Sequence, residues 1–196
     1  LSSGSQSWGF RLTLLPPSSL LFFGLSLSPA GDVNADGIDD LIIGCRFSTY
    51  LNRSISGIAY IYFGKPQGYM FSNINVTTEW VTGTHGFRVF GSAPGDQLGN
   101  QVGGGVDVNG DGISDLIVGS YSADPFGRSN AGIVTVLYGH SGVWGDIDLI
   151  NMSPDNGYQI YGAVVGEQLG YAVALSSDMN GDGIGEIIFN VPYTNP

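Results

Sequence analysis

The sequence predicts an all-β protein assembled from repeated four-stranded units. Three observations support this prediction: the 196 residues include 32 glycines, only 12% of residues are charged while 42% are hydrophobic, and one acidic segment recurs three times. The chain is too apolar for a disordered acidic tail and has too few charges for long surface helices. Short β-branched or aromatic runs, separated by Gly, Asn, Asp and Pro, indicate strands joined by turns.

The recurring acidic segment defines the period of the repeat. It begins at Asp32, Asp107 and Asp178, so successive copies start 75 and 71 residues apart. An apolar residue followed by glycine precedes each copy, with the glycine eight residues before the aspartate, and a Gly or Asn stands twenty residues after that glycine. Because these intervals are identical in all three copies, they indicate a structural repeat.

Each repeat contains about four strands. The strand-like runs at 57–64 and 132–139 both end at a glycine that lies twenty residues beyond the preceding landmark. A four-stranded antiparallel unit with a period longer than that of common solenoids predicts a blade of a β-propeller. The expected units are 1–85, which includes a divergent N-terminal linker at 12–22, then 86–156, and finally a truncated unit at 157–196.

This organisation predicts an incomplete ring. Propellers have about four or more blades, so we expect three repeats to form an arc of a larger propeller whose remaining blades belong to a longer chain. The start at Leu1 and the stop directly after a strand-like run agree with this expectation. In an antiparallel blade, the loop between the first two strands and the loop between the last two lie at one end, so we expect the acidic loops to share a face.

The acidic loop has the oxygen pattern of a cation site. Oxygen-bearing side chains occupy positions 1, 3, 5 and 9, position 7 would offer its backbone carbonyl, and glycine at position 6 permits the positive φ that wrapping around an ion requires. Calcium takes about six to eight oxygen ligands, and we expect up to three Ca²⁺ ions. The expected ligands are Asp32, Asn34, Asp36, Ile38 and Asp40; Asp107, Asn109, Asp111, Ile113 and Asp115; and Asp178, Asn180, Asp182, Ile184 and Glu186.

Two other interpretations of the loop compete with a cation site. An EF-hand needs a glutamate at position 12 and flanking helices, but that position holds Ile43, Val118 or Phe189 in strand-like runs. A plain turn rich in Asp, Asn and Gly is the second alternative. Three copies in the same spacing favour metal binding, because closely spaced carboxylates without a cation repel one another. The third loop differs from the other two because position 9 is a glutamate, Glu186, instead of an aspartate.

The combined motifs resemble a known repeat. The apolar-Gly pairs, the Asp-x-Asn-x-Asp-Gly-x-x-Asp/Glu loops and the Gly-x-x or Asn-x-Pro that follows are similar to the FG-GAP repeat of integrin alpha subunits, from about Gly9 to Pro192. Related repeats occur in glycosylphosphatidylinositol-specific phospholipase D and in microbial surface proteins. The segments 44–46 and 119–121 depart from the family by lacking Ala-Pro. The pairs that carry the resemblance are Phe23-Gly24, Leu98-Gly99 and Leu169-Gly170.

The resemblance implies an extracellular adhesion or recognition module, secreted or at the cell surface, within a ring of seven blades. Calcium would brace the hairpins on one face, and a protein ligand or partner subunit would bind the opposite face. Exposed aromatic and arginine side chains contribute most of the binding energy in many interfaces. The simpler explanation for those in these loops is that they are ordinary surface residues without a binding role. The partner-binding candidates in the loops between the second and third strands are Tyr50, Arg53, Tyr121, Phe126 and Arg128.

Composition argues against several other functions. A net charge of −11 with six Lys and Arg in total excludes a surface built for nucleic acid or anionic lipid. His85 and His140 stand alone, and the sequence has none of the usual catalytic motifs, so we expect no enzymatic activity. The alternative is an accessory propeller of a secreted hydrolase such as glycosylphosphatidylinositol-specific phospholipase D. A single cysteine, Cys45, excludes an internal disulfide framework.

The sequence also raises questions of processing. The apolar stretch 12–28 is compatible with a leader cleaved near Ala30. The pair Phe23-Gly24 within it, however, keeps the same interval to Asp32 as in the other copies, which favours a divergent linker. It is too short to span a bilayer, so we expect no membrane insertion by this segment. Three Asn-x-Ser/Thr triplets are compatible with a secreted glycoprotein. The glycosylation candidates are Asn52, Asn75 and Asn151.

Overall fold

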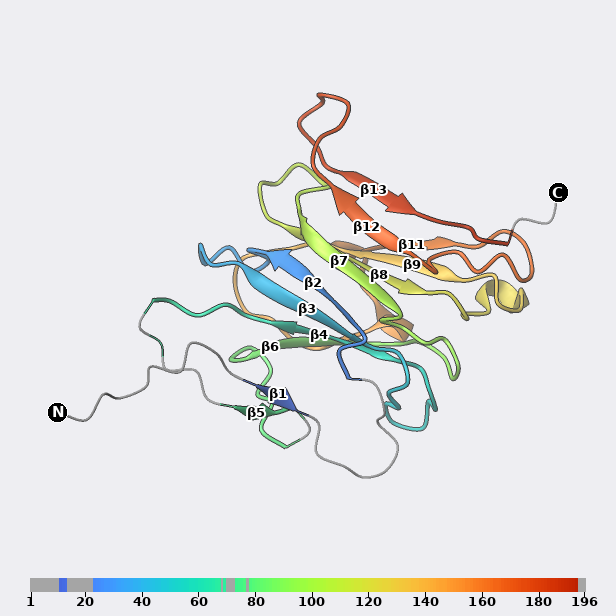
Figure 1. Cartoon of the computed structure of the whole chain (residues 1–196), viewed down its shortest axis with the longest axis horizontal. Coiled ribbons are helices and arrows are strands. Elements are labelled where there is room, and N and C mark those ends of the chain that lie inside the picture. The colour runs from blue at the N-terminus through green and yellow to red at the C-terminus, as the bar shows by residue number, and fades with distance from the viewer. Residues whose placement is uncertain (1–10, 14–22, 68, 70–72, 77, 194–196) are drawn as a thin grey trace.

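The computed structural model describes residues 11–13, 23–67, 69, 73–76 and 78–193 (Figure 1). In this part of the chain the regular elements are β-strands and three short 3₁₀ turns, and none is an α-helix. The all-β prediction is therefore confirmed. No helix among the described residues is long and apolar enough to cross a membrane. The 3₁₀ turns are η1 (Pro125–Gly127), η2 (Leu149–Asn151) and η3 (Pro154–Asn156).

The first blade is an antiparallel sheet in the order β2-β3-β4-β6. Its innermost strand contributes to the first acidic hairpin, and its outermost strand pairs on the far edge with the short parallel strand β10. The third strand, β4, is buried along its whole length. The strands are β2 (Ser26–Gly31), β3 (Asp40–Cys45), β4 (Ile58–Tyr62), β6 (Gly86–Phe90) and β10 (Ile147–Asp148).

The second blade repeats this order as β7-β8-β9-β11, and β12 and β13 form the hairpin that begins a third. The fold is thus a partial β-propeller, as expected. The sequence predicts repeats that end at residues 85 and 156. The fourth strand of each complete sheet begins directly after these residues, so each sheet includes the first strand of the next predicted repeat. The strands are β7 (Gln101–Val106), β8 (Asp115–Ser120), β9 (Ile133–Leu137), β11 (Gly157–Tyr161), β12 (Val173–Ser176) and β13 (Glu186–Phe189).

Neighbouring blades pack closely where the apolar-Gly pair of one blade meets the preceding blade. Leu98 is fully buried, and its backbone N–H donates to the carbonyl of Ser56 at 2.9 Å. A Cβ atom at Gly44 would lie only 2.1 Å from the carbonyl oxygen of Gly99. The second interface is the same, because a Cβ at Gly119 would lie 2.2 Å from the carbonyl oxygen of Gly170.

The twenty-residue interval between landmarks has a direct cause in the second and third copies. The N–H of Gly99 donates to the carbonyl of Gly119 at 3.1 Å, and the N–H of Gly170 donates to the carbonyl of Asn190 at 3.2 Å. Each hydrogen bond joins the start of the first strand to the end of the second. The interval is constant because it spans one hairpin of fixed length.

A long connection between the third and fourth strands fastens each blade to its predecessor. We call residues 138–156 the strap. Its strand β10 pairs in parallel with β6, and Trp144 stacks on Phe87 with ring centroids 4.1 Å apart. The first repeat has the same arrangement, in which β5 (Ile74–Asn75) pairs in parallel with β1 (Leu12–Thr13).

The N-terminal segment is described only in part. Leu12–Thr13 forms β1, and Ser26–Gly31 forms the inner strand of the first blade. Residues 14–22, which hold most of the expected linker at 12–22 and of the possible leader at 12–28, lie outside the described residues. Both interpretations of this segment remain predictions.

Replacing Gly119 with alanine tests the contact between blades. The added methyl group would meet the carbonyl of Gly170 and force the blades apart, so we expect Gly119→Ala to lower the free energy of unfolding by about 2–3 kcal/mol. Urea denaturation followed by circular dichroism measures this change. Gly145→Ala is the control, since nothing lies within 4 Å of a Cβ at that position. Equal stability of the two variants would contradict the proposed close contact.

Candidate metal centre

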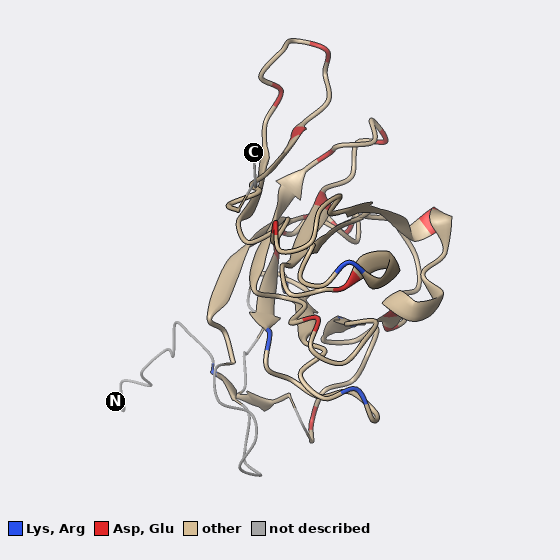
Figure 2. Cartoon of the chain, turned by 90° about the vertical axis from the view of Figure 1, so that its right-hand side faces the viewer, with Lys and Arg blue, Asp and Glu red and all other residues tan. Residues whose placement is uncertain are grey.

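The three acidic loops lie at the same end of the blades, as the antiparallel order requires. Each joins the inner strand of a blade to its second strand, and the two uppermost hairpin loops in Figure 2 carry acidic residues. Neighbouring loops are linked through their backbones. The carbonyl of Asp32 accepts the N–H of Ser114 at 3.3 Å, and the carbonyl of Asp107 accepts the N–H of Gly185 at 2.8 Å. The loops therefore form a connected row.

The aspartate at position 1 organises the backbone of each loop. The carboxylate of Asp107 accepts the N–H groups of Asn109, Gly110 and Gly112, the last at 2.6 Å. Burial opposes ionisation, but these backbone donors together hold the pKa of Asp107 below its usual value. The pKa of Asp178 is lowered mainly by the N–H groups at 183 and 181. Asp107 and Asp178 therefore carry a negative charge in the folded loops.

Positions 3 and 5 are joined by the same pair of hydrogen bonds in every copy. In the second loop the amide Nδ2 of Asn109 donates to Oδ2 of Asp111 at 3.0 Å, and Oδ1 of Asn109 accepts the N–H of Asp111 at 2.9 Å. The first loop has this arrangement between Asn34 and Asp36, and the third has it between positions 180 and 182. One loop geometry is thus repeated three times.

The aspartate at position 9 ties the acidic loop to the end of the third strand. Asp40 and Asp115 are buried, and each accepts one N–H from position 2 of its loop and one from a glycine 24 residues later, Gly64 or Gly139, at 2.8 Å. Burial, reinforced by the neighbouring carboxylates, raises the pKa of Asp40 and of Asp115 to about 6. Sequence analysis missed this link, although the constant interval of 24 residues from the position-9 aspartate to the glycine could have indicated it.

The third loop differs from the other two. Glu186 accepts the N–H of Met179 at 2.7 Å, as position 9 does elsewhere. Met179 is 71% exposed, however, whereas its counterpart Val33 is fully buried. Position 7 shows the same trend, because Ile184 is exposed while Ile38 is partly buried. The second blade covers Val33, with the N–H of His140 donating to its carbonyl at 3.0 Å, whereas no described strand follows β13 to cover the third loop in the same way.

Two positions of the loop have a left-handed backbone. Position 6 has the positive φ that its glycine was expected to allow, with values of 86°, 84° and 88°. Position 4 is also left-handed, with φ of 58° at Ala35, 82° at Gly110 and 85° at Gly181. Sequence analysis missed position 4, because its glycine is replaced by alanine in the first copy.

The donor set fits a hard cation by its chemistry. Every expected ligand offers oxygen, which is what Ca²⁺ prefers, and the charges of Asp36 and Asp32 are close enough to raise the pKa of Asp40. Within the described residues, no three His, Cys, Asp or Glu side chains are gathered in a group that could hold a metal ion. The loops thus supply suitable ligands, with side chains bonded to one another and to the backbone.

Two of the five partner-binding candidates contact the strap or the edge of the first blade. Arg53 is only 9% exposed, and its guanidinium makes a two-pronged ion pair with Asp148 of the strap, with both N–O distances at 2.7 Å. Tyr50 stacks flat on Phe90, with ring centroids 3.5 Å apart. These side chains hold the first blade and the strap together.

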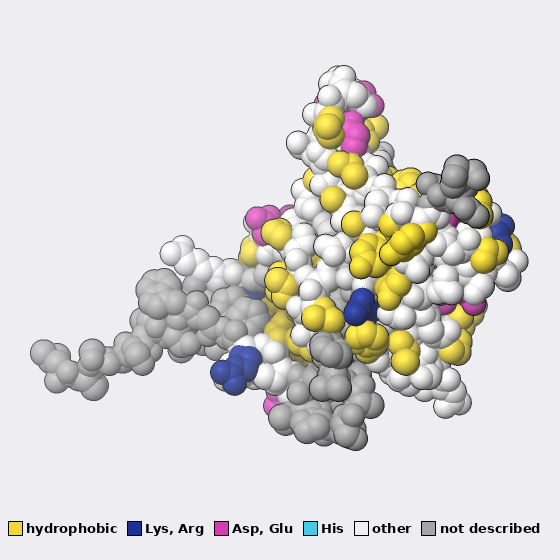
Figure 3. Space-filling model, turned by 45° about the vertical axis from the view of Figure 1, so that its right-hand side comes forward, with side chains coloured by type: hydrophobic (Ala, Val, Ile, Leu, Met, Phe, Trp, Pro, Cys, Tyr) yellow, Lys and Arg dark blue, Asp and Glu magenta, His cyan; other side chains and the backbone are white. Residues whose placement is uncertain are grey.

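The other three candidates belong to the second blade. Tyr121 donates its hydroxyl to Gln97 at 3.0 Å. Phe126 is 77% exposed and adopts a strained φ of 54°, and the guanidinium of Arg128 lies 4.9 Å from the centre of its ring. In the first blade, Leu51 is similarly exposed and left-handed, at 73% and 51°. Figure 3, in which the right-hand side of Figure 1 comes forward, shows exposed hydrophobic side chains together with a few basic ones.

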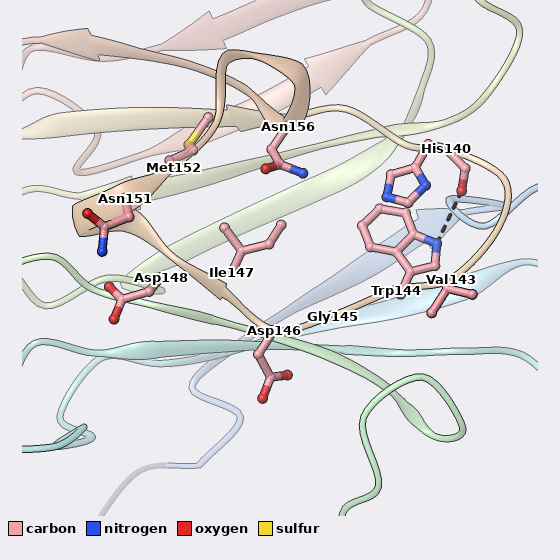
Figure 4. A pocket seen from close by; sticks show the side chains of 10 residues that line it. All are labelled: His140, Val143, Trp144, Gly145, Asp146, Ile147, Asp148, Asn151, Met152 and Asn156. Carbon is pink, nitrogen blue, oxygen red and sulfur yellow. Dashed lines mark hydrogen bonds between the residues drawn. The ribbon is translucent and has the colours of Figure 1, made fainter.

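The strap encloses a pocket of about 390 Å³ that sequence analysis did not anticipate (Figure 4). Trp144 forms one wall and donates its indole N–H to the carbonyl of His140 at 3.1 Å, and the His140 ring stacks on it at 3.8 Å. Asp146 points away from the pocket and pairs with Arg88. His140 therefore packs within the strap.

The remaining candidates for chemistry also have structural partners. His85 accepts the N–H of Val81 at its Nδ1, and burial is the main cause of its lowered pKa. Cys45 is buried in the first blade, where burial raises the pKa of the thiol to about 12. A thiol with so high a pKa is a poor nucleophile.

Comparison with known proteins identifies the repeat. Residues 98–137 match the FG-GAP repeat, a segment that begins at the buried Leu98 and ends with β9. Integrin alpha-PS2 of Drosophila melanogaster is 36% identical over 104 residues, which are 52% of this chain and 7% of that protein. Integrin alpha pat-2 of Caenorhabditis briggsae is 30% identical over 123 residues, or 63% of this chain and 9% of that protein.

A relative of another kind aligns with more of the chain. Phosphatidylinositol-glycan-specific phospholipase D of Homo sapiens is 27% identical over 180 residues, which are 85% of this chain and 19% of that protein. The chain thus spans less than a fifth of the length of each of these three relatives.

The blades and the acidic hairpins define the class as part of a β-propeller, and residues 98–137 within it match one FG-GAP repeat. The resemblance recognised in the sequence is confirmed, since the relatives include both integrin alpha subunits and the phospholipase.

The left-handed position 4 predicts opposite effects for two substitutions. Ala35→Gly removes a Cβ from a conformation that disfavours it, so we expect the free energy of unfolding to rise by about 0.5–1 kcal/mol, while Gly110→Ala should lower it by about 1 kcal/mol. Both are measured by urea denaturation without calcium. Changes of the same sign in the two variants would contradict the shared loop geometry.

The ion pair between Arg53 and Asp148 predicts a dependence on pH. The hydrogen bonds from Arg53 lower the pKa of Asp148, so the pair adds stability above about pH 4 that is lost as the pH falls through the folded pKa. We expect Asp148→Asn to destabilise the protein by about 1–2 kcal/mol at pH 7.

Comparing urea denaturation of the two proteins at several pH values checks this expectation. The difference between wild type and Asp148→Asn should shrink between about pH 4 and pH 2. A difference that stays constant over this range would show that the charge of Asp148 contributes nothing.

Proposed function

We propose that the chain is a calcium-binding arc of a β-propeller that serves as an extracellular adhesion or recognition module, similar to that of integrin alpha subunits. The observation that carries this proposal is the threefold repetition of one oxygen-rich loop, held by the same backbone hydrogen bonds on one face. Backbone hydrogen bonds account for the acids at positions 1 and 9, and the acid at position 5 in each copy adds a further charged oxygen donor that a hard cation would use.

Bound ions would neutralise the carboxylates of the acidic loops and stabilise the conformation of the hairpins. In each loop the ligands would be the side chains at positions 1, 3, 5 and 9 and the carbonyl at position 7, as expected from the sequence. A divalent ion supplies positive charge that offsets the mutual repulsion of these carboxylates. Because backbone hydrogen bonds link each loop to the next, stiffening one hairpin would also support its neighbour.

The opposite face is the proposed surface for a protein ligand or partner subunit. The exposed, strained Phe126 with Arg128 beside it supports this role better than Tyr50 or Arg53, whose side chains contact the chain itself. Large apolar residues held in a strained conformation at loop tips often serve recognition. The rest of the seven-bladed ring would come from a longer chain, and the similarity to integrin alpha subunits supports an extracellular or cell-surface location.

A second function is favoured by a specific finding. The similarity to phosphatidylinositol-glycan-specific phospholipase D covers more of this chain than the integrin matches do, so the arc would serve as the accessory propeller of a secreted hydrolase. An upstream domain rich in metal-binding His and Asp would support this alternative. Downstream β-sandwich domains and a membrane span would support the adhesion module, which has no catalytic activity of its own.

Calcium titration tests the metal sites directly. We expect the melting temperature to rise with calcium concentration, because an ion that binds only the folded state contributes about 2.7 kcal/mol per site at a hundred times its dissociation constant. The titration is best performed at pH 7.5, where Asp40 and Asp115, whose pKa is about 6, are ionised. Differential scanning fluorimetry and isothermal titration calorimetry supply the measurements.

Two neutralising substitutions in one loop separate ligation from general charge. Asp36→Asn removes the negative charge of an expected ligand, so it should weaken the response to calcium and leave the sites of the other two loops. Asp39→Asn removes the same charge from an exposed, non-ligand position of that loop, and its calcium response should match that of wild type. An unchanged melting curve for wild type across millimolar calcium, or equal losses in the two variants, would refute the proposed sites.

A further inference from the structure

The three glycosylation triplets of the sequence occupy very different environments in the fold. Asn52 and Ser54 are exposed at the tip of the loop between β3 and β4, Asn75 is buried in β5, and Asn151 ends the turn η2. We propose that Asn52 carries an N-linked glycan and that Asn75 and Asn151 do not. This inference rests on the proposed extracellular location, since the modification requires passage through a secretory compartment.

The loop tip presents the first triplet in a fixed conformation. Tyr50 and Arg53 exchange backbone hydrogen bonds of 3.0 and 3.4 Å, which close a tight turn over Leu51 and Asn52. Arg53 is turned inward to Asp148, while the residues on either side of it are exposed. Asn52 and Ser54 are both exposed in this turn, so the triplet is available to solvent.

The second triplet is incompatible with a bulky modification. Asn75 is 6% exposed and lies in β5, where it pairs with Thr13 of β1. Its backbone N–H donates to the carboxylate of Glu79 at 2.6 Å. A glycan on this side chain would have to displace the pairing of β1 with β5, so we expect the folded protein to lack it.

The third triplet has its hydroxyl group committed elsewhere. Ser153 caps the turn η3, with its Oγ accepting the N–H of Asp155 at 3.3 Å. Its neighbour Met152 packs against the core, and Pro154 follows directly. The asparagine is exposed, but the hydroxyl and the backbone around it are held in a shape that does not present the triplet.

The modification is a group transfer. The amide Nδ2 of Asn52 attacks the anomeric carbon of an oligosaccharide carried on a polyprenyl diphosphate. A bond forms between that nitrogen and carbon, the bond from the carbon to the diphosphate oxygen breaks, and Nδ2 loses one proton. The lipid diphosphate leaves with the electron pair of the broken bond.

A glycan at this position would act on the proposed recognition face. It would cover the neighbouring Leu51, whose side chain is 73% exposed, and so shield the apolar tip of the first blade. The corresponding tip of the second blade, at Phe126, has no such triplet. Recognition would then be directed to the second blade, around Phe126 and Arg128.

Expression through the secretory pathway of eukaryotic cells tests the assignment. The chain is fused to a cleavable secretion signal, and its intact mass is measured before and after peptide N-glycosidase, in both the medium and the cell lysate. We expect one glycan on wild type, its loss in Asn52→Gln and Ser54→Ala, and its retention in Ser54→Thr. Asn75→Gln and Asn151→Gln should not change the number of glycans.

The possible results are decisive. A wild-type chain without a glycan in either fraction, or a glycan that persists in Asn52→Gln and Ser54→Ala, would overturn the inference. Loss of a glycan in Asn75→Gln or Asn151→Gln would do the same. Because the secretion signal is supplied, the result does not depend on where the natural protein is located. Calcium binding is measured in a separate experiment, so a failure of the glycan assignment is distinguishable from a failure of the proposed function.

Discussion

The close approach of neighbouring blades at paired glycines is the constraint on which the rest of the structure depends. The backbone at Gly99 lies against Gly44, and the backbone at Gly170 lies against Gly119, where no Cβ would fit. This approach aligns the inner strands β2, β7 and β12 side by side. Because the inner strands are aligned, the acidic hairpins come to one face, and each loop can hydrogen-bond to the next.

The strap supplies a second connection between blades, at the outer edge of the sheet. It adds a parallel strand to β6, stacks Trp144 on Phe87 and pairs Asp148 with Arg53. Arg53, a residue chosen from the sequence as a binding candidate, therefore contributes to the cohesion of the arc. Close contacts at the inner edge and the strap at the outer edge together explain how an arc of blades holds its shape.

The two ends of the blades present different surfaces. Acidic loops with ordered backbones lie at one end, and exposed, strained apolar tips such as Leu51 and Phe126 lie at the other. The proposed calcium ions and the proposed glycan would act on opposite ends. Ions would stiffen the hairpins, while the glycan would restrict which loop tips a partner can reach.

Local patterns in the sequence were sufficient to predict the repeat, the all-β class, the acidic hairpins and the positive φ at Gly112, because each depends on residues that are close along the chain. The bond from Asp115 to Gly139, 24 residues away, and that from Arg53 to Asp148, 95 residues away, arise only when the sheets assemble. Such contacts depend on which strand edges meet in space. Turn propensity and strand periodicity carry no information about that choice, so the tertiary structure alone decided which side chains are buried partners and which remain exposed.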